Sequence, residues 1–419
     1  MRRSRIPRGL QQLVAETVRV MRDPSLLLWS LYILLFPVYV IKSGLPQPGD
    51  LLMFLLVPVV FASGSNRLFP AAVAPTRALL VFTAYTMLVN VTWTVALNNY
   101  SLIDTKNGFL FTLSFYIYNG VFFLLALVLY SRYRERFLWL TLQLTLISVV
   151  LQVLISFVFS RGASRSSVLF NNPNQLGYFA VLSASILCLG RRRLGLGTVS
   201  ATIGLLASAY LALLSSSKAA LGATAILVIV GLLSNPRFIV VSVLGALLLL
   251  VTSNRVTDAI DRARTRIETD QSADFFEERG YDRILDNKEL WFLGAGEGGY
   301  RRFKDTSAIG AHELHSSAGT IFFCYGILGT ILFGVFAWRV MERGRLRYIL
   351  LLMPASAYGL THQGLRFTLL WVLLALFIAL KDYERRGVQS PREARRARAR
   401  ARARQVGPPM RPVGVQTKP

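Results

Sequence analysis

The feature that most constrains this 419-residue chain is a series of long apolar runs that contain almost no charged residues. Charged residues make up 16% of the sequence, against about a quarter in an average soluble protein. A transmembrane helix needs about 20 consecutive apolar residues, so the runs indicate membrane spans rather than a soluble core. We therefore predict an all-α polytopic membrane protein with about twelve transmembrane helices. The candidate spans are 25–43, 51–66, 78–97, 109–130, 138–160, 177–190, 195–214, 219–234, 237–252, 316–337, 348–361 and 365–380.

The short loops between the runs are rich in arginine on one side of the predicted membrane. Cytoplasmic loops carry an excess of Lys and Arg, so this side is predicted to be cytoplasmic, with both termini on it. The segments on this side are 1–24, 67–77, 131–137, 191–194, 235–236, 338–347 and 381–419. The formal net charge of +25 therefore reflects topology and does not indicate a nucleic-acid partner.

The layout divides the chain into five regions. A basic cytoplasmic segment, 1–24, which lacks the pattern of a secretory signal peptide, precedes transmembrane helices 1–9 in residues 25–252. A periplasmic loop, 253–315, precedes helices 10–12 in residues 316–380. The Arg-rich tail, 381–419, is predicted to be disordered, because its Ala-Arg alternation cannot bury a core. We interpret the tail as an anchor to anionic membrane lipids rather than as a nucleic-acid or regulatory arm.

The loop 253–315 departs from the basic pattern. It contains thirteen of the chain's 22 carboxylates and is long enough for two or three short helices. Its apolar residues predict that it folds over the outer face of the membrane. We therefore expect any chemistry of this protein to be located there.

All three histidines, His312, His315 and His362, fall in outer segments or at their edges. Imidazole is the natural proton acceptor near neutral pH. Because a span begins directly after His315, this side chain is predicted to lie at the mouth of a helix at the membrane surface. The alternative is an interfacial histidine with only a structural hydrogen bond.

A glycine-rich turn, Gly294-Ala-Gly296-Glu297-Gly298, lies in the same loop. Glycines permit close approach of the backbone to a ligand, and the backbone N–H groups could hold an anion. Arg279, Arg283, Arg301 and Arg302 could bind phosphate in a bidentate manner. The alternative is a flexible turn whose arginines pair with neighbouring carboxylates.

Further polar groups lie at predicted outer turns. They are Arg165, Asn172 and Asn174 before the sixth span, Lys218 between two apolar runs, and His362 with Gln363 and Arg366. An ionisable residue at membrane depth is a candidate functional residue, although Lys218 could equally reach the outer surface by snorkelling. The two cysteines, Cys188 and Cys324, lie in apolar runs. The sequence has no Asp-x-Asp pair and no zinc-binding pattern, so metal-independent chemistry without a cofactor is predicted.

The start of the tenth predicted span resembles a signature of the O-antigen ligase/polymerase superfamily, a histidine followed by an apolar stretch and Gly-x-x-Gly. The matching run is His315-Ser-Ser-Ala-Gly-Thr-Ile-Phe-Phe-Cys-Tyr-Gly326-Ile-Leu-Gly329. Four other short motifs occur in the same order along this chain as in the superfamily. They are Asn172-Pro-Asn174, Ser217-Lys218, the Arg283-x10-Gly294 spacing and the Gly294-Ala-Gly-Glu-Gly298 turn. The resemblance covers roughly residues 160–375, and it departs from the superfamily at Ser316, where Asn is common, and at Lys218, which replaces Arg.

The resemblance implies an inverting glycosyltransferase of the bacterial inner membrane, with its active site facing the periplasm. Its donor would be an oligosaccharide on undecaprenyl pyrophosphate. His315 would take the proton from the acceptor hydroxyl, and Arg283, with Arg279, Lys218 and Arg165, would bind the pyrophosphate. The residues expected to shape the loop or bind substrate are Gly294, Gly296, Glu297, Gly298, Asn172, Asn174, His312, His362 and Arg366. A chain-length regulator and a flippase are the protein partners implied.

Four functions are consistent with the sequence. The first is a polymerase that joins lipid-linked repeat units into O-antigen or exopolysaccharide, and the second is a ligase that transfers the glycan to lipid A-core. A transporter or flippase of lipid-linked sugars would tend to show two matched halves, which this sequence lacks. A purely structural membrane protein leaves the polar groups of the outer loop unexplained.

Overall fold

A computed structural model describes most of the chain. The described residues are 20, 22–41, 46–64, 66–101, 108–159, 166–191, 194, 196–233, 257–258, 260–261, 264–265, 268, 280–303 and 313–405. Within them the structure is helical and contains no strand. The long helices are α2 (Pro24–Leu35), α3 (Pro48–Ala62), α4 (Pro70–Ala96), α5 (Phe109–Tyr133), α6 (Glu135–Phe159), α7 (Pro173–Arg191), α8 (Thr198–Ser215), α9 (Lys218–Leu233), α14 (Ser317–Met341), α15 (Leu346–Thr361) and α16 (Thr368–Gln405).

Several helices begin where the sequence supplies a proline and a side-chain cap. In α2, the Asp23 carboxylate accepts from the backbone N–H groups of Ser25 and Leu26 at 3.1 and 3.3 Å. In α7, Asn172 Oδ1 accepts from the N–H of Gln175 at 2.9 Å. Proline at the first helical position loses no intrahelical bond, and the side-chain acceptor satisfies one of the unpaired N–H groups of the first turn. These signals therefore fix where the helices start.

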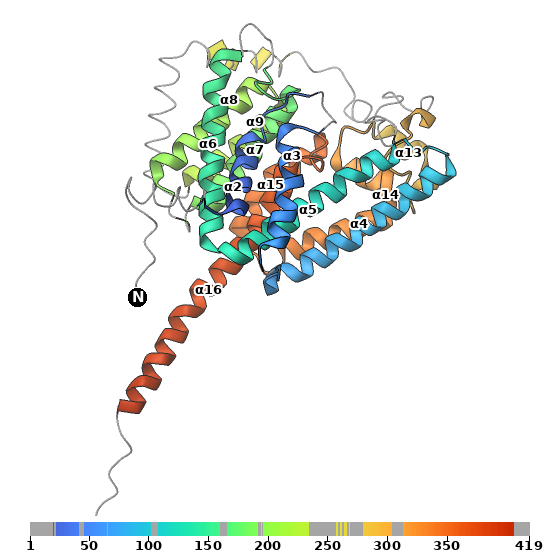
Figure 1. Cartoon of the computed structure of the whole chain (residues 1–419). Helices are drawn as coiled ribbons and strands as arrows, with labels where there is room; N and C mark the ends of the chain where they lie inside the picture. The colour runs from blue at the N-terminus through green and yellow to red at the C-terminus, as the bar shows by residue number, and fades with distance from the viewer. Residues whose placement is uncertain are drawn as a thin grey trace, which may run out of the picture.

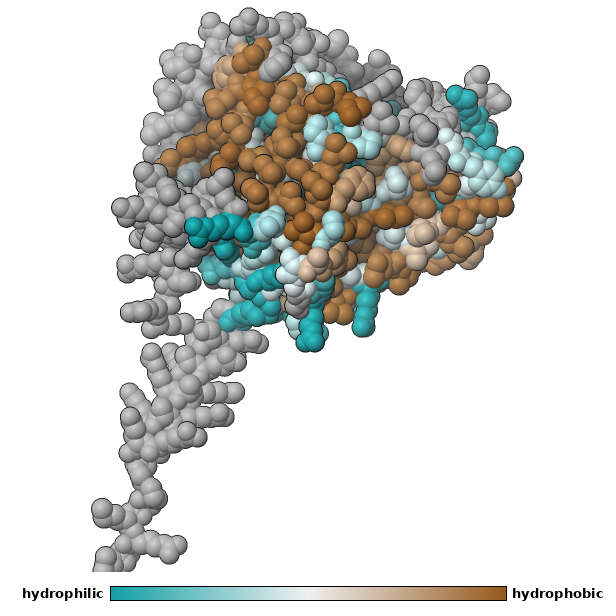
Figure 2. Space-filling view, in the orientation of Figure 1, coloured by the Kyte–Doolittle hydropathy of each residue, from teal (hydrophilic) through white to brown (hydrophobic). Residues whose placement is uncertain are grey.

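The prediction of a multi-pass membrane protein is confirmed in its coarse form. Five described helices, α4, α5, α6, α8 and α14, are long and apolar enough to cross a membrane. Eleven of the twelve predicted spans coincide with a helix, and the run 237–252 lies outside the described residues. The number of spans and the side of each loop stay predictions. Figure 2 shows apolar residues over much of the visible face, with hydrophilic residues along its lower edge and at the far right.

The helix ends form two groups, which we call the inner end and the outer end. At the inner end, Asp382 of α16 accepts from the Tyr130 hydroxyl at 2.9 Å and pairs with Arg134 at 3.4 Å. Glu384, two residues further along α16, pairs with Arg345 and Arg347 at 3.3 and 3.4 Å. The segments predicted to be cytoplasmic therefore meet one another around two carboxylates of the last helix.

Two groups of helices share α16 as their common neighbour. One group joins α4, α5 and α14, and the other joins α7, α8, α9 and α15. Helix α16 contacts α4, α5 and α14 in the first group and α7 in the second. In Figure 1 the first group extends to the right and α16 leaves the bundle at the bottom. The turn before α16, residues 362–367, is therefore central to the outer end.

Helix α16 continues beyond its apolar part as far as Gln405. The disorder expected for the tail, 381–419, stays a prediction. Alanine and arginine are both strong helix formers, and the last apolar turns of α16 supply a nucleus from which the helix extends. Residues 406–419 lie outside the described part.

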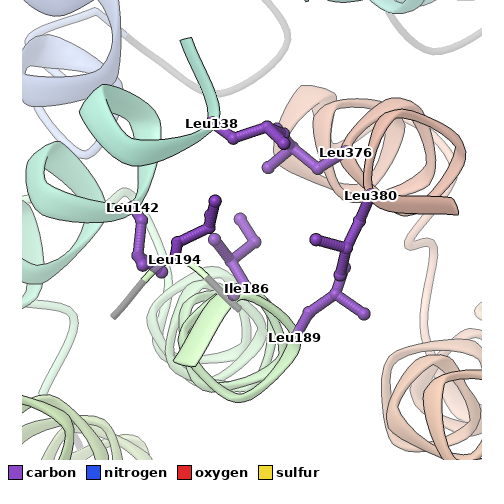
Figure 3. Close-up of a pocket in the computed structure, with 8 residues that line it drawn as sticks. Leu138, Leu142, Ile186, Leu189, Leu194, Leu376 and Leu380 are labelled. Carbon is purple, nitrogen blue, oxygen red and sulfur yellow. The ribbon is translucent and has the colours of Figure 1, made fainter. Parts of the chain in front are cut away.

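A small recess near the inner end has purely aliphatic walls (Figure 3). Leu138 and Leu142 of α6 face Ile186 and Leu189 of α7, and Leu376 and Leu380 of α16 close the side. The remaining lining residues are Gly190 and Leu194. Since it contains no polar side chain, this recess offers no group for chemistry.

Candidate functional site

Helix α14 is broken at Gly326, within the signature that begins at His315. Gly326 has φ +64° and ψ −168°, which no α-helical residue adopts. The outer loop fills the break. The N–H groups of Ala295 and Gly296 donate to the carbonyl oxygens of Phe323 and Cys324, both at 2.8 Å, and the Ile327 N–H donates to the Trp291 carbonyl at 2.7 Å. Backbone groups that the break releases are therefore bonded to the glycine-rich loop, as an apolar environment requires.

Two glycines make this close approach possible. A Cβ on Gly294 would overlap the backbone of Cys324, and a Cβ on Gly326 would overlap the backbone of Phe292. Both residues also have positive φ, +89° and +64°. Only glycine meets both conditions without strain. The structure thus brings together two of the motif pieces, the glycine-rich turn and the Gly-x-x-Gly that follows His315.

A buried carboxylate, Glu297, lies at the centre of this loop and is completely shielded from solvent. Its Oε2 accepts from the hydroxyls of Tyr116 and Tyr325 at 2.8 and 3.0 Å. Its Oε1 pairs with Arg366 Nη2 at 2.6 Å. The backbone N–H of Glu297 donates to Asn90 Oδ1 at 2.9 Å. Glu297 therefore joins α4, α5, α14 and the turn before α16.

Arg366 bridges two carboxylates. Its Nη1 lies 2.6 Å from Oε2 of Glu313, and Nη2 binds Glu297. The guanidinium carbon lies 5.0 Å from the ring centre of Phe115. Burial opposes the charged form of Arg366, but Glu313 and Glu297 outweigh it and raise the pKa of Arg366 above its usual value. The guanidinium and the two carboxyl groups have a formal charge of −1 in sum.

His315 is exposed at the start of α14. Ser316 caps this helix, because its Oγ accepts from the N–H of Gly319 at 3.0 Å. The Ser317 hydroxyl donates to the carbonyl of His362 at 3.1 Å and accepts from the Gly364 N–H at 2.7 Å. Histidines 315 and 362 are thus carried by two segments that are bonded to each other. His362 also stacks near Tyr358, with ring centres 4.6 Å apart.

The loop is tied to the same place by Tyr281. Its hydroxyl lies 2.7 Å from Oγ of Ser316 and 2.8 Å from the carbonyl oxygen of Leu360. Tyr281, near the beginning of the described segment 280–303, therefore bridges the start of α14 and the end of α15, next to His315.

Arg283 is buried in this structure. Its side chain is 0% exposed, with its guanidinium 5.5 to 5.9 Å from the ring centres of Tyr300, Phe303 and Phe323. Burial lowers the pKa of Arg283 below its usual value. Its observed contacts are those of a residue that holds the loop on α14. The role of Arg283 as a phosphate ligand stays a prediction.

Arg302 lies in the same aromatic environment. Its guanidinium carbon is 4.3 Å from the Trp93 ring centre and 4.6 Å from that of Phe303. One Nη group donates to the Ala295 carbonyl, whereas Nε and the other Nη are buried without a hydrogen-bond partner. Burial lowers the pKa of Arg302 to about 10. Two desolvated cations therefore lie beneath the glycine-rich loop.

Two other motifs singled out in the sequence, the Asn172–Asn174 turn and Ser217-Lys218, lie near each other at the outer end. Gly177 of α7 lies so close to Ser215 and Ala220 that a Cβ on it would be 2.8 Å from each. The Asn172–Asn174 turn, which begins α7, is therefore near the start of α9, where Lys218 is exposed. The Tyr358 hydroxyl donates to the carbonyl of Asn174 at 2.7 Å, which links this turn to the His362 side of the outer end. Arg165, Arg279 and His312 lie outside the described residues.

Sequence reasoning did not identify Glu313, Tyr116 or Tyr325. Glu313 is only two residues before His315, which is the one local signal that could have indicated it. The two tyrosines are typical of helix interiors, and only the position of Glu297 gives them a polar partner. No group of three or more His, Cys, Asp or Glu side chains able to hold a metal ion occurs among the residues that the structure describes.

No family model matches this chain, and no curated protein does. The functional argument therefore depends on the residues themselves.

Proposed function

We propose that this protein is a membrane glycosyltransferase that transfers an oligosaccharide from a polyprenyl pyrophosphate to a sugar hydroxyl at the outer end of the bundle. The product is a longer lipid-linked glycan, as made by a polysaccharide polymerase. The donor, undecaprenyl pyrophosphate in the simplest case, would approach from the outer leaflet. The acceptor would be a second lipid-linked repeat unit.

The observation that carries the proposal is the environment of His315. Its imidazole is exposed, whereas the chain directly after it is fixed by the hydrogen bonds of Ser316 and Ser317, one of them to Tyr281. A general base must be accessible to substrate yet held in one place. The start of α14 meets both needs at the level where a membrane helix would leave the bilayer.

The proposed chemistry uses a base and fixed cations. His315 takes the proton of the acceptor hydroxyl while the acceptor oxygen bonds to the anomeric carbon. The bond from that carbon to the pyrophosphate oxygen breaks, and the pyrophosphate keeps the electron pair. Inversion follows because the acceptor attacks the face opposite the leaving group.

Cations stabilise the leaving group in this proposal. Lys218 is exposed at the start of α9 and can contact the pyrophosphate directly. Arg283 and Arg302 are desolvated beneath the loop, and charges in a medium of low polarity act over several ångströms. They contribute a positive potential without leaving their aromatic surroundings. Asn174 and His362 line the side from which the acceptor would enter.

The test is reconstitution of the purified full-length protein in liposomes with a purified lipid-linked repeat unit. We expect longer lipid-linked chains in the absence of any other protein. His315→Ala should lower chain formation by at least about a hundredfold, since a positioned base contributes roughly 10²–10⁴ in rate. Lys288→Ala is the matched control, because Lys288 is exposed in the same loop and has no proposed role.

The other outcomes have distinct meanings. Product only after addition of lipid A-core would identify a ligase with the same donor site. Movement of the lipid-linked sugar across the bilayer without bond formation would identify a transporter. Wild-type chain length with His315→Ala would exclude the proposed base.

A further inference from the structure

In residues 313–315, which precede α14, the exposure of the side chains alternates. Leu314 is completely buried, whereas His315 is exposed and the Glu313 side chain retains 34% exposure. Residues 313–316 are neither helix nor strand, and the chain bends at His315. Glu313 and His315 flank the buried Leu314, and both side chains retain access to solvent.

Arg366 fixes the carboxylate of Glu313 from beneath. The 2.6 Å contact to Glu313 uses Nη1, and the 2.6 Å contact to Glu297 uses Nη2. Glu297 is itself immobilised by two tyrosine hydroxyls. Of the two carboxylates on this arginine, only Glu313 reaches the surface. Glu313 is also the one that lies two residues from His315 in the chain.

We propose that Glu313 is a positioning residue for His315, orienting its imidazole and stabilising the imidazolium. This inference rests on the proposed function. As the acceptor hydroxyl gives its proton to the imidazole, the ring gains one positive charge, which the Glu313 carboxylate offsets. The proton then leaves to solvent, and the neutral imidazole is restored.

The charged and titratable groups around this pair come from every neighbouring segment. They are Arg366 of the turn before α16, Glu297 and Tyr300 of the loop, Tyr281 beside Ser316, and His362 at the end of α15. Arg366 is neutralised by Glu297, so it does not cancel the effect of Glu313. A nearby anion favours the charged form of imidazole and raises its pKa.

The decisive variant is Glu313→Gln, with Glu289→Gln as control because Glu289 is exposed in the same loop. Glu313→Gln leaves Arg366 paired with Glu297, so the fold should persist, as monodispersity in detergent can verify. Diethyl pyrocarbonate acylates only neutral imidazole. The pH midpoint of His315 acylation, followed by mass spectrometry of its peptide, therefore reports the imidazole pKa without turnover.

We expect the midpoint to fall by about one pH unit in Glu313→Gln and to stay unchanged in Glu289→Gln and Glu313→Asp. The acid limb of the kcat/KM profile should move in the same direction, with a loss of about tenfold in rate. An unchanged midpoint in Glu313→Gln would overturn the inference even if activity falls. The acylation experiment remains informative if His315→Ala proves active, so failure of the proposed function is distinguishable.

Discussion

Arg366 is the residue on which three parts of the outer end depend. It joins the glycine-rich loop through Glu297, the segment before α14 through Glu313, and the end of α15 through its own turn. Glu297 is 0% exposed, so its charge has no access to water. Removing the partner of a buried charge leaves a desolvation cost that nothing offsets.

We therefore expect Arg366→Ala to lower the free energy of unfolding by roughly 3–5 kcal/mol. The double variant Arg366→Met with Glu297→Gln should recover most of this loss, because it removes the buried cation and the buried anion together. Thermal unfolding of the purified protein in detergent measures both effects. Arg343→Ala is the control, since its ion pair with Glu342 lies at the surface and its side chain is 75% exposed.

The sequence identified Glu297 and Arg366 separately, as loop or substrate-binding residues, but it did not pair them. They are 69 positions apart, and no local pattern predicts which carboxylate reaches which guanidinium. His315 was predicted at the mouth of a helix at the membrane surface, and it is exposed two residues before Ser317, the first residue of α14. An abrupt change from polar to apolar residues is a local signal, so the sequence alone indicates where this helix begins. The position of His315 relative to a membrane stays a prediction.

At the scale of elements, the informative feature is the break in α14. The sequence predicts one continuous span from 316, and the helix does begin there. The break at Gly326 depends on hydrogen bonds between α14 and the loop 291–296. The sequence of α14 alone therefore does not predict the break. A glycine in a helix can lie in a regular turn or at a break, and here the contact with the loop decides between them.

Gly326→Ala tests this feature. The added Cβ would overlap the backbone of Phe292, and alanine would also have to adopt φ +64°. We expect the loop to lose its place on α14, with greatly increased proteolysis between 280 and 303 and loss of glycan synthesis. Gly334→Ala in the same helix should behave as wild type, because nothing lies within 4 Å of its added Cβ. Equal protease resistance of the two variants would contradict the role assigned to the break.

At the scale of the whole molecule, the inner and outer ends differ in charge. Asp382 and Glu384 gather arginines from the α5–α6 and α14–α15 connections, whereas the outer end holds His315 and the loop. Hydropathy and loop charge predicted which helix ends would meet, because both are sums over many residues. For the tail two local signals differ, because its Ala-Arg repeat has a high helix propensity but cannot form a core.

Topology can be measured with single cysteines in a Cys188→Ser, Cys324→Ala background. We expect Lys288→Cys to react with a membrane-impermeant maleimide in intact cells, and Arg343→Cys to react only after permeabilisation. Both parent side chains are exposed, so burial does not limit labelling. Reaction of Arg343→Cys in intact cells would contradict a cytoplasmic inner end.

The place of α16 in the chain has a consequence for biogenesis. Synthesis delivers Glu297 to the outer side 69 residues before Arg366 exists, and the arginines of the inner end precede Asp382 and Glu384 in the same way. Both ends of a nascent protein therefore carry uncompensated charge until the last helix inserts. A chain that stops before this turn and α16 would therefore lack the cation that pairs with Glu297 at one end and the carboxylates that pair with Arg134, Arg345 and Arg347 at the other.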